Sequence, residues 1–161
     1  AQGLYHARPD LAKALILCDT AAKIGNAEMW NDRIAIARDG GLAALVDANM
    51  QRWFSPAFHA DRATELHGYR AMFTRTPLDG YIGTGMAIRD ADFRYQAPNI
   101  TVPTVFVVGY QDGATPPDLV RGTAEMIPGA KFELVKDAGH IPCAEQPAAI
   151  IKIIRDVMAD L

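Results

Sequence analysis

The sequence has 161 residues, of which 50% are hydrophobic and 22% charged, and its formal net charge is −3. This is the composition of a soluble globular protein, and the absence of a basic block or of an apolar run of about 18 residues argues against nucleic-acid partners and against a membrane-spanning protein. Two cysteines, Cys18 and Cys143, stand far apart and match no metal or redox spacing. They suit a reducing cytoplasm better than a disulfide scaffold.

The first twenty residues predict the end of a helix followed by a core strand. Residues 1–10 (AQGLYHARPD) contain no initiator methionine and no targeting pattern. A helix here must stop before Pro9, because the residue before a proline is pushed out of the helical region. We therefore expect the chain to begin in the tail of a helix and to lack an upstream segment. The apolar run from Leu11 to Thr20 then predicts a strand buried in a parallel sheet.

Residues 21–95 predict a helical lid subdomain inserted after this strand. Asn26 is a suitable N-cap, Gly40 and Gly41 interrupt the helical pattern, and Pro77 suits the first turn of a later helix. We expect about four helices and no strand in this part. The apolar residues recur at helical spacing in two stripes, which are Trp30, Ile34 and Ala37, and then Leu42, Leu45, Val46 and Met50.

Residues 96–161 return to an alternation of strands and helices. Thr104 to Val108 is dense in β-branched residues and predicts a strand, residues 118–130 predict a helix, KFELV predicts another strand, and residues 147–161 predict a final helix. Such alternation is typical of a parallel sheet with helices on its faces. The sequence therefore predicts an α/β protein, in which residues 1–20 and 96–161 form the core and residues 21–95 the lid.

Three polar residues, Asp19, Asp112 and His140, follow the predicted strands. Sites in open parallel sheets form outside the carboxyl ends of the strands, and a single helix joins the strands before Asp112 and His140, so their loops should meet. A carboxylate next to an imidazole fixes the ring tautomer and stabilises the imidazolium, and a pKa near ~6.5 suits histidine as a base at neutral pH. Alternatively, His140 bonds only backbone and QDG is only a turn signal.

The segments VFVVGYQDGATPP and GAKFELVKDAGHIPCAEQP resemble the acid and base segments of the α/β-hydrolase fold, in which the chain order is nucleophile, acid, histidine. Further segments narrow the match: RPDLAKALILCDTAAKIG, EMWNDRIAIARDGGLAAL, RWFSPAF and GYIGTGMAIRDADFR are similar to the 3-oxoadipate enol-lactonases of bacterial aromatic catabolism. The resemblance runs along the whole chain. The acid and base segments are common to the fold, whereas the lid segments are more discriminating.

This resemblance implies hydrolysis of 3-oxoadipate enol-lactone in the β-ketoadipate pathway, with His140 as the base, Asp112 as its acid and no metal or organic cofactor. Asp19 is a competing acid, because some members of the fold place the acid after this earlier strand. The nucleophilic serine would lie in a Gly-x-Ser-x-Gly elbow upstream of the chain. The single serine here, Ser55, lacks flanking glycines and is interpreted as a turn residue, and Cys18 and Cys143 as small hydrophobes.

The lid is expected to supply the substrate pocket, with Trp30, Arg33 and Trp53 as the preferred substrate-binding residues. An arginine could clamp the carboxylate of the implied substrate. Each single candidate could equally be a core aromatic or a surface arginine, and the further candidates are Phe54, Phe58, Tyr81, Arg52 and Arg89.

We further expect the chain to be a fragment that is inactive alone, with the missing N-terminal half of the same enzyme as its partner, because three strands would leave an unpaired sheet edge. The alternative functions are another esterase of this fold, a haloperoxidase-like enzyme, a C–C bond hydrolase and a nucleophile-free protein that binds a small acid.

Overall fold

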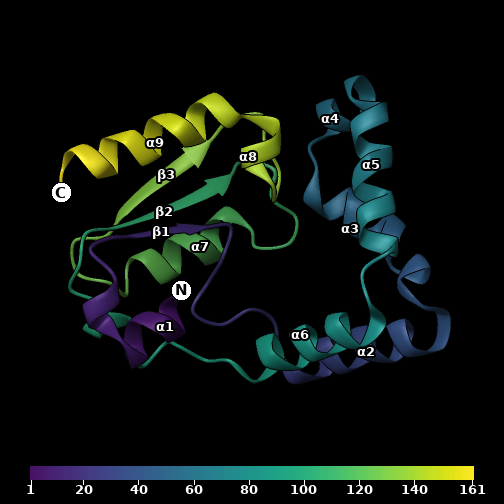
Figure 1. Ribbon diagram of the computed structural model, residues 1–161, viewed down its shortest axis with the longest axis horizontal. Coiled ribbons are helices and arrows are strands. Elements are labelled where there is room, and N and C mark those ends of the chain that lie inside the picture. The colour runs from purple at the N-terminus through teal and green to yellow at the C-terminus, as the bar shows by residue number, and fades with distance from the viewer.

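A computed structural model describes all 161 residues and contains one three-stranded sheet. Strands β1 (Leu15–Cys18), β2 (Thr104–Gly109) and β3 (Lys131–Val135) lie side by side in the order β1-β2-β3, and both pairings are parallel (Figure 1). Five α-helices are inserted between β1 and β2, and one α-helix joins β2 to β3. The predicted α/β class, a parallel sheet with a helical insertion after its first strand, is confirmed.

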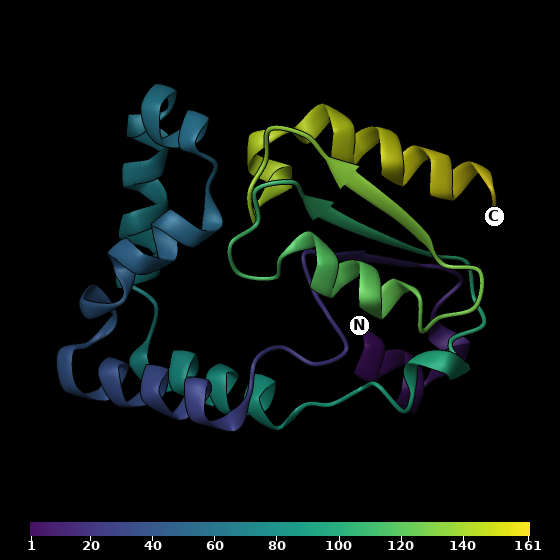
Figure 2. The same cartoon turned by 180° about the vertical axis from the view of Figure 1, so that it is seen from behind.

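The central strand β2 contributes to a hydrophobic core on each face of the sheet. Side chains alternate between the two faces of a strand. Phe106 and Val108 pack with helices α1 (Gln2–Ala7) and α7 (Pro117–Ala124), while Val105 and Val107 pack with α9 (Pro147–Ala159). Figures 1 and 2 show α7 and α9 on opposite sides of the sheet. Every residue of β2 is buried, as expected of the middle strand of a covered parallel sheet.

The first strand is shorter than the apolar run that predicts it. Helix α1 ends at Ala7, before Pro9 as expected, but residues Pro9–Leu11 form a 3-10 turn and delay the strand until Leu15. At the other end Asp19 adopts a left-handed conformation with φ of 49°, which ends the extended backbone. The strand therefore spans only the middle of the run from Leu11 to Thr20.

The insertion contains five α-helices rather than about four. Asn26 caps the first of them by accepting a hydrogen bond from the Met29 N–H at 2.8 Å, and Gly41, with φ of 66°, follows its end as expected. The additional helix begins at Pro56 and is capped by Ser55, whose Oγ accepts from the Phe58 N–H at 3.2 Å. The five helices are α2 (Ala27–Gly40), α3 (Val46–Trp53), α4 (Pro56–Asp61), α5 (Ala63–Thr74) and α6 (Leu78–Asp90).

The inserted helices lie beyond the carboxyl ends of the strands. In Figures 1 and 2 the strand arrows point toward this helical part, in which α2 and α6 lie side by side. Helices α3, α4 and α5 share their own core, in which Met50, Phe54 and Phe58 are almost fully buried. The insertion therefore faces the sheet edge where parallel-sheet proteins place their sites.

Backbone hydrogen bonds at the end of α3 join the insertion to the sheet. The Trp53 carbonyl accepts from the His140 N–H at 2.8 Å, and the Arg52 carbonyl accepts from the Gly113 N–H at 3.1 Å. These two bonds fix the loops that follow β3 and β2 against the same helix.

No helix of the structure has both the length and the apolar character that a membrane span requires.

Candidate active site

His140 and Asp112 are in direct contact, as their positions after neighbouring strands predict. Asp112 lies in the loop after β2, and His140 lies in the loop between β3 and the short helix α8 (Pro142–Glu145). The His140 Nδ1–H donates to Asp112 Oδ2 over 2.9 Å. An imidazole held at Nδ1 in this way leaves Nε2 available to accept a proton.

Asp112 is almost completely buried, and hydrogen-bond donors surround its carboxylate. Oδ1 accepts from the backbone N–H groups of Ala114 (2.7 Å) and Thr115 (2.9 Å), and Oδ2 accepts from the Thr115 hydroxyl (2.8 Å) as well as from His140. Burial alone would raise the pKa of Asp112, but the hydrogen bond and charge of His140 and the donors of Thr115 lower it below its usual value. The group is therefore an ionised acceptor for the imidazole.

The His140 ring is oriented by the insertion as well as by Asp112. Its plane lies 29° from that of the Trp53 ring, with 6.2 Å between the ring centroids. The residue before it, Gly139, packs so tightly that a Cβ there would lie 2.5 Å from the Trp53 carbonyl oxygen. A side chain at position 139 would push the loop away from α3, so glycine is required for this placement of the histidine.

Asp19 lies in the same cluster but forms no hydrogen bond with the imidazole. Its Oδ1 accepts from the Gly109 N–H at 3.0 Å, and ligand atoms of Asp19, Asp112 and His140 all lie within 4.8 Å of one another. The pKa of Asp19 is raised to about 7, mainly by burial and also by the neighbouring Asp112 carboxylate, while the Gly109 N–H and His140 act in the opposite direction. Of the two candidate acids, Asp112 is the one that holds the ring.

The same three side chains have the spacing of metal ligands, but their hydrogen bonds leave little capacity for a cation. A carboxylate offers about four lone-pair directions, and four donors already occupy those of Asp112. In this cluster only the second oxygen of Asp19 and Nε2 of His140 accept no hydrogen bond. The donor set therefore fits proton transfer better than metal ligation.

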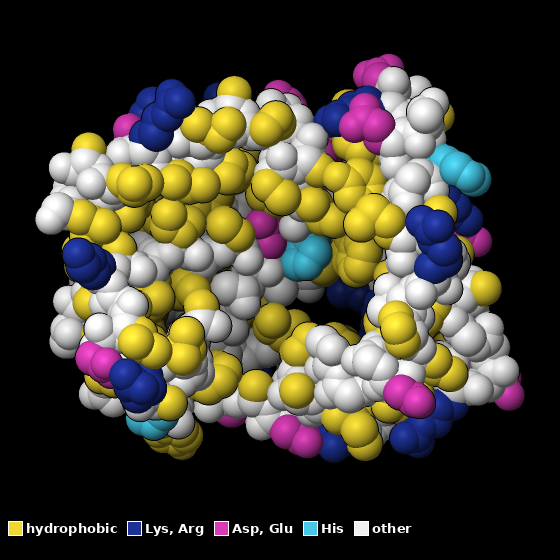
Figure 3. Space-filling model, viewed as in Figure 1, with side chains coloured by type: hydrophobic (Ala, Val, Ile, Leu, Met, Phe, Trp, Pro, Cys, Tyr) yellow, Lys and Arg dark blue, Asp and Glu magenta, His cyan; other side chains and the backbone are white.

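The candidate residues border one large cavity of about 810 Å³ between the sheet and the insertion. This volume lies in the usual range for small-molecule sites. Trp30, Arg33 and Trp53 line it together with His140 and Asp19. Figure 3 shows the hollow between the two parts of the molecule, with hydrophobic side chains around it. The structure thus places all three preferred substrate-binding candidates in the wall of the same cavity as the histidine.

Arg33 has no carboxylate within ion-pair distance, although it is partly buried in the cavity wall. Its Nε–H donates to the Tyr81 hydroxyl at 2.6 Å and its Nη2 donates to Asn49 Oδ1, so both partners are neutral. Its guanidinium carbon lies 6.0 Å from the ring centroids of both Trp30 and Tyr81. The arginines that do form ion pairs are Arg8, Arg62, Arg70, Arg89 and Arg94.

The remaining sequence candidates separate into two groups. Tyr81 and Arg52 line the cavity, and the Arg52 Nε–H also donates to the Gly113 carbonyl at 3.0 Å. Phe54 and Phe58 instead belong to the core of the insertion, and Arg89 pairs with Asp90 away from the cavity lining. Periodicity could not distinguish these groups, because both lie on helices of the same insertion.

Three supporting residues were missed by sequence reasoning. The Thr115 hydroxyl donates to Asp112. A threonine three residues after an aspartate is typical of a local turn held by side chains, so the sequence could have indicated this contact. Glu145 accepts from the Gly139 N–H at 2.7 Å and from both the N–H and the hydroxyl of Ser55, so it ties the histidine loop to α4. Asn49 bonds Arg33 and Glu145 bonds Ser55 across 16 and 90 positions of the sequence, and such contacts leave no local signal.

None of the possible nucleophiles within the chain lines the cavity next to His140. Ser55 is buried, caps α4 and donates its hydroxyl proton to Glu145, in agreement with its interpretation as a turn residue. Cys18 is exposed rather than buried in its strand as expected, yet partial burial and the neighbouring Asp19 raise the pKa of its thiol to about 11. A thiol of this pKa is protonated at neutral pH and is a poor nucleophile.

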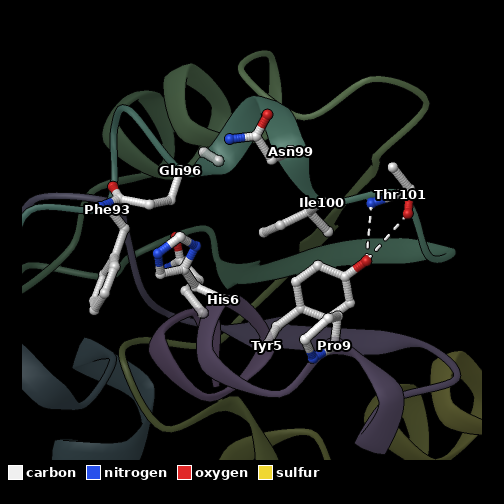
Figure 4. A pocket seen from close by; sticks show the side chains of 10 residues that line it. Tyr5, His6, Pro9, Phe93, Gln96, Asn99, Ile100 and Thr101 are labelled. Atoms are coloured by element: carbon white, nitrogen blue, oxygen red, sulfur yellow. Dashed lines mark hydrogen bonds between the residues drawn. The ribbon is translucent and has the colours of Figure 1, made fainter.

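A second, smaller cavity of about 320 Å³ lies between α1 and residues 93–101 (Figure 4). The Tyr5 hydroxyl accepts from the Thr101 N–H at 3.3 Å there, and His6 stands in the cavity wall. His6 has no carboxylate hydrogen-bond partner, so this cavity lacks the paired acid and base of the larger one. The larger cavity is the candidate active site.

Comparison with known proteins agrees with this architecture. No family model matches the chain. The 3-oxoadipate enol-lactonases 2 and 1 of Acinetobacter baylyi are each 30% identical, over 93% and 87% of this chain and over 56% and 52% of their own lengths. A relative from Mycobacterium tuberculosis with a provisional non-heme bromoperoxidase name is 28% identical over 93% of this chain and 60% of its own length.

The crystal structure of an enol-lactonase from Burkholderia xenovorans superposes with a TM-score of 0.93 at 35% identity. The match covers 98% of this chain and 60% of that protein, so the chain spans little more than half the length of the proteins it resembles. A thermophilic esterase from Thermogutta terrifontis, at 24% identity, has the same fold with a TM-score of 0.91. The chain therefore belongs to the α/β-hydrolase fold family, and within that family it is related to the 3-oxoadipate enol-lactonases.

Proposed function

We propose that the protein containing this chain hydrolyses a small enol-lactone that carries a carboxylate, with 3-oxoadipate enol-lactone as the leading candidate. One observation carries this proposal: His140, which Asp112 holds by a hydrogen bond, lines the same cavity as Arg33, a cation that has only neutral partners. The pair suits acyl transfer, and the arginine suits an anionic substrate. The similarity to enol-lactonases supports the same substrate class. We therefore propose that the protein acts in the β-ketoadipate pathway of bacterial aromatic catabolism, in the cytoplasm.

The nucleophile is proposed to be a serine from a segment outside these 161 residues. Within the chain, Ser55 is used as a helix cap, and β1 pairs only with β2, so its other edge can accept a further strand. A parallel strand paired there would end beside Asp19, at the carboxyl-terminal end of the strands, where His140 also lies. This rest of the protein is the proposed partner of the chain, and the chain alone is expected to be inactive.

In the proposed reaction, His140 Nε2 takes the serine proton as the serine oxygen attacks the lactone carbonyl. The imidazolium is stabilised by Asp112 and then protonates the leaving enol oxygen, and the enol becomes the 3-oxo group. Water, deprotonated by the same imidazole, then attacks the acyl carbon; the serine oxygen leaves and takes the proton from the imidazolium, and the acyl group is released as the second carboxylate. Backbone N–H groups near the serine would bind the oxyanion, each contributing about 3–4 kcal/mol by mutational precedent.

Arg33 is proposed to bind the substrate carboxylate. Guanidinium has five N–H donors, and Tyr81 and Asn49 use two of them, which leaves others for a carboxylate in the cavity. The two neutral partners hold the side chain in place without neutralising its charge. Trp30 is held similarly, because its indole N–H donates to the Ile24 carbonyl at 2.8 Å, and it is proposed with Trp53 to form the apolar walls. Helices α2 to α6 would then act as the lid of the site.

The experiment compares two substrates in the full-length protein: the carboxylate-bearing enol-lactone and a neutral ester of similar size. Arg33→Gln should raise KM for the lactone about 10- to 100-fold, as expected for a hydrogen bond to a charged group, and leave the neutral ester unchanged. Arg38→Gln, an exposed arginine on the same helix, is the matched control and should change neither. Equal losses on both substrates would overturn the assignment of Arg33.

A second candidate function has support from the relative with a bromoperoxidase name. The same acid and base pair could serve another esterase, a haloperoxidase-like enzyme or a C–C bond hydrolase of this fold. A full-length protein that turns over the neutral ester faster than the lactone would favour this group. A full-length protein without any nucleophile opposite His140 would instead bind a small acid without hydrolysis.

A further inference from the structure

Asp19 is a buried carboxyl group that the proposed reaction does not use. It directly follows β1, is only 8% exposed and has a left-handed backbone with φ of 49°. This conformation is uncommon for residues other than glycine, and such strain tends to occur at functional sites. Its side chain accepts a single hydrogen bond, from the Gly109 N–H. Asp19 therefore has a constrained position and few donors to stabilise a negative charge.

The charge of Asp19 is disfavoured by its neighbour. Carboxylate atoms of Asp19 and Asp112 lie within 4.8 Å of each other, and two carboxylates at this separation in a buried site do not both ionise readily. Four donors stabilise the charge on Asp112, against one donor for Asp19. The proton that the pair retains therefore resides on Asp19, in agreement with its pKa of about 7, which burial raises.

The other ionisable groups around Asp19 do not neutralise it. Asp112 faces it from the loop after β2, His140 from the loop after β3, and the Cys18 thiol from the same strand. Arg33 and Arg52 border the cavity from α2 and α3, but neither forms an ion pair with Asp19 within 4.0 Å. The one positive charge that can develop close to Asp19 is the imidazolium of His140.

We propose that Asp19 is a positioning residue whose proton is coupled to the His140–Asp112 pair, so that its ionisation adds a second negative charge to support the imidazolium. When Asp19 is neutral, Asp112 supports the imidazolium alone. When Asp19 loses its proton, two carboxylates stabilise the cation that forms as the serine is deprotonated. The rate consequence rests on the proposed hydrolytic function, whereas the coupling of the protons does not.

The kinetic test is the pH profile of kcat/KM for Asp19→Asn in the full-length enzyme. Asparagine keeps the Oδ1 acceptor for Gly109 and tolerates the left-handed backbone, but it cannot ionise. The variant should match the wild type on the acidic side and be about 10-fold slower on the alkaline side, which corresponds to one pKa unit of interaction. Its acid limb should shift to lower pH by about one unit. A loss that is equal at every pH would be a structural effect and would overturn the proposal.

The second test does not require activity. Infrared difference spectra of the full-length protein, recorded across pH 5 to 9 (roughly two units on either side of the value expected for Asp19), should contain the carbonyl band of a protonated carboxyl that disappears near neutral pH. This band should be absent in Asp19→Asn and present in Asp137→Asn, an exposed aspartate with the same left-handed backbone (φ of 54°).

In Asp112→Asn the band should disappear at lower pH, because the neighbouring negative charge is gone. If Asp19→Asn does not fold, this shift in Asp112→Asn tests the coupling in its place. A wild type without the band would overturn the proposal whatever its substrate. A wild type with the band but without lactone hydrolysis would instead contradict the proposed function alone.

Discussion

Two glycines determine where the acid and the base of this site can lie. A Cβ at Gly109, the last residue of β2, would be 1.9 Å from the Gly139 carbonyl oxygen, and a Cβ at Gly139 would be 2.5 Å from that of Trp53. The loops after β2 and β3 therefore pack backbone against backbone. This close approach brings the Asp112 carboxylate within hydrogen-bond distance of the His140 ring.

Gly109→Ala should destabilise the full-length protein by about 1–3 kcal/mol, the usual cost of overpacking, because neither contacting backbone segment can rotate away. Chemical denaturation measures this free energy of unfolding. Gly122→Ala is the control: a Cβ at this helical position meets no atom within 4 Å, and alanine should stabilise the protein by about 0.5–1 kcal/mol. Equal stability of the two variants would show that the loops are not packed as described.

Asp19 should also make the stability of the full-length protein depend on pH. Its pKa is about 7 in the folded state, above the value near 3.9 expected in the unfolded chain, so the folded state binds more protons between these values. Stability contributed by Asp19 is thus present below about pH 4 and is lost as the pH rises toward 7. Asp19→Asn should gain stability relative to wild type across this window in thermal denaturation. A constant difference at every pH would contradict the raised pKa.

At the scale of elements, the sequence predicted what depends on local chemistry. The strands β2 and β3, the end of α1 before Pro9 and the Asn26 cap of α2 all follow from neighbouring residues, and the structure contains each of them. The short helices α4 and α8 were not predicted, since one turn or two carry too little periodicity. Trp53 was expected as a wall residue, but the contact of its carbonyl with the His140 N–H joins residues 87 positions apart and no local pattern encodes it.

Helix α2 carries both Trp30 and Arg33, so its first turn affects the cavity. Asn26→Ala removes the side-chain acceptor of the Met29 N–H and should cost about 1 kcal/mol, measured as the shift in the denaturation midpoint. Asn26→Ser restores an acceptor at the same exposed position and should recover most of this loss. If serine and alanine were equally destabilising, the cap would not be the reason that α2 begins there.

At the scale of the whole molecule, the site lies between two parts that contribute different functions. The sheet positions the proposed acid and base after β2 and β3, and the insertion contributes the arginine and the aromatic side chains that line the cavity. The alternation of strands and helices predicted this arrangement, and the lid segments indicated the relatives. Arg33 was preferred over Arg89 from its position in the sequence, and the structure places Arg33 but not Arg89 in the cavity wall; this outcome depends on which side of the packed α2 and α6 faces the cavity, which no local pattern encodes.

The most direct test of the account is kcat/KM for the enol-lactone in three full-length proteins: wild type, His140→Gln and Asp112→Asn. The account predicts that the wild type opens the lactone and that each variant loses about 10⁴-fold, because the first removes the base and the second leaves it in the wrong tautomer. The double variant should be little worse than either single one, since the two residues act as a unit. A His140→Gln protein that still opens the lactone at the wild-type rate would contradict the central claim.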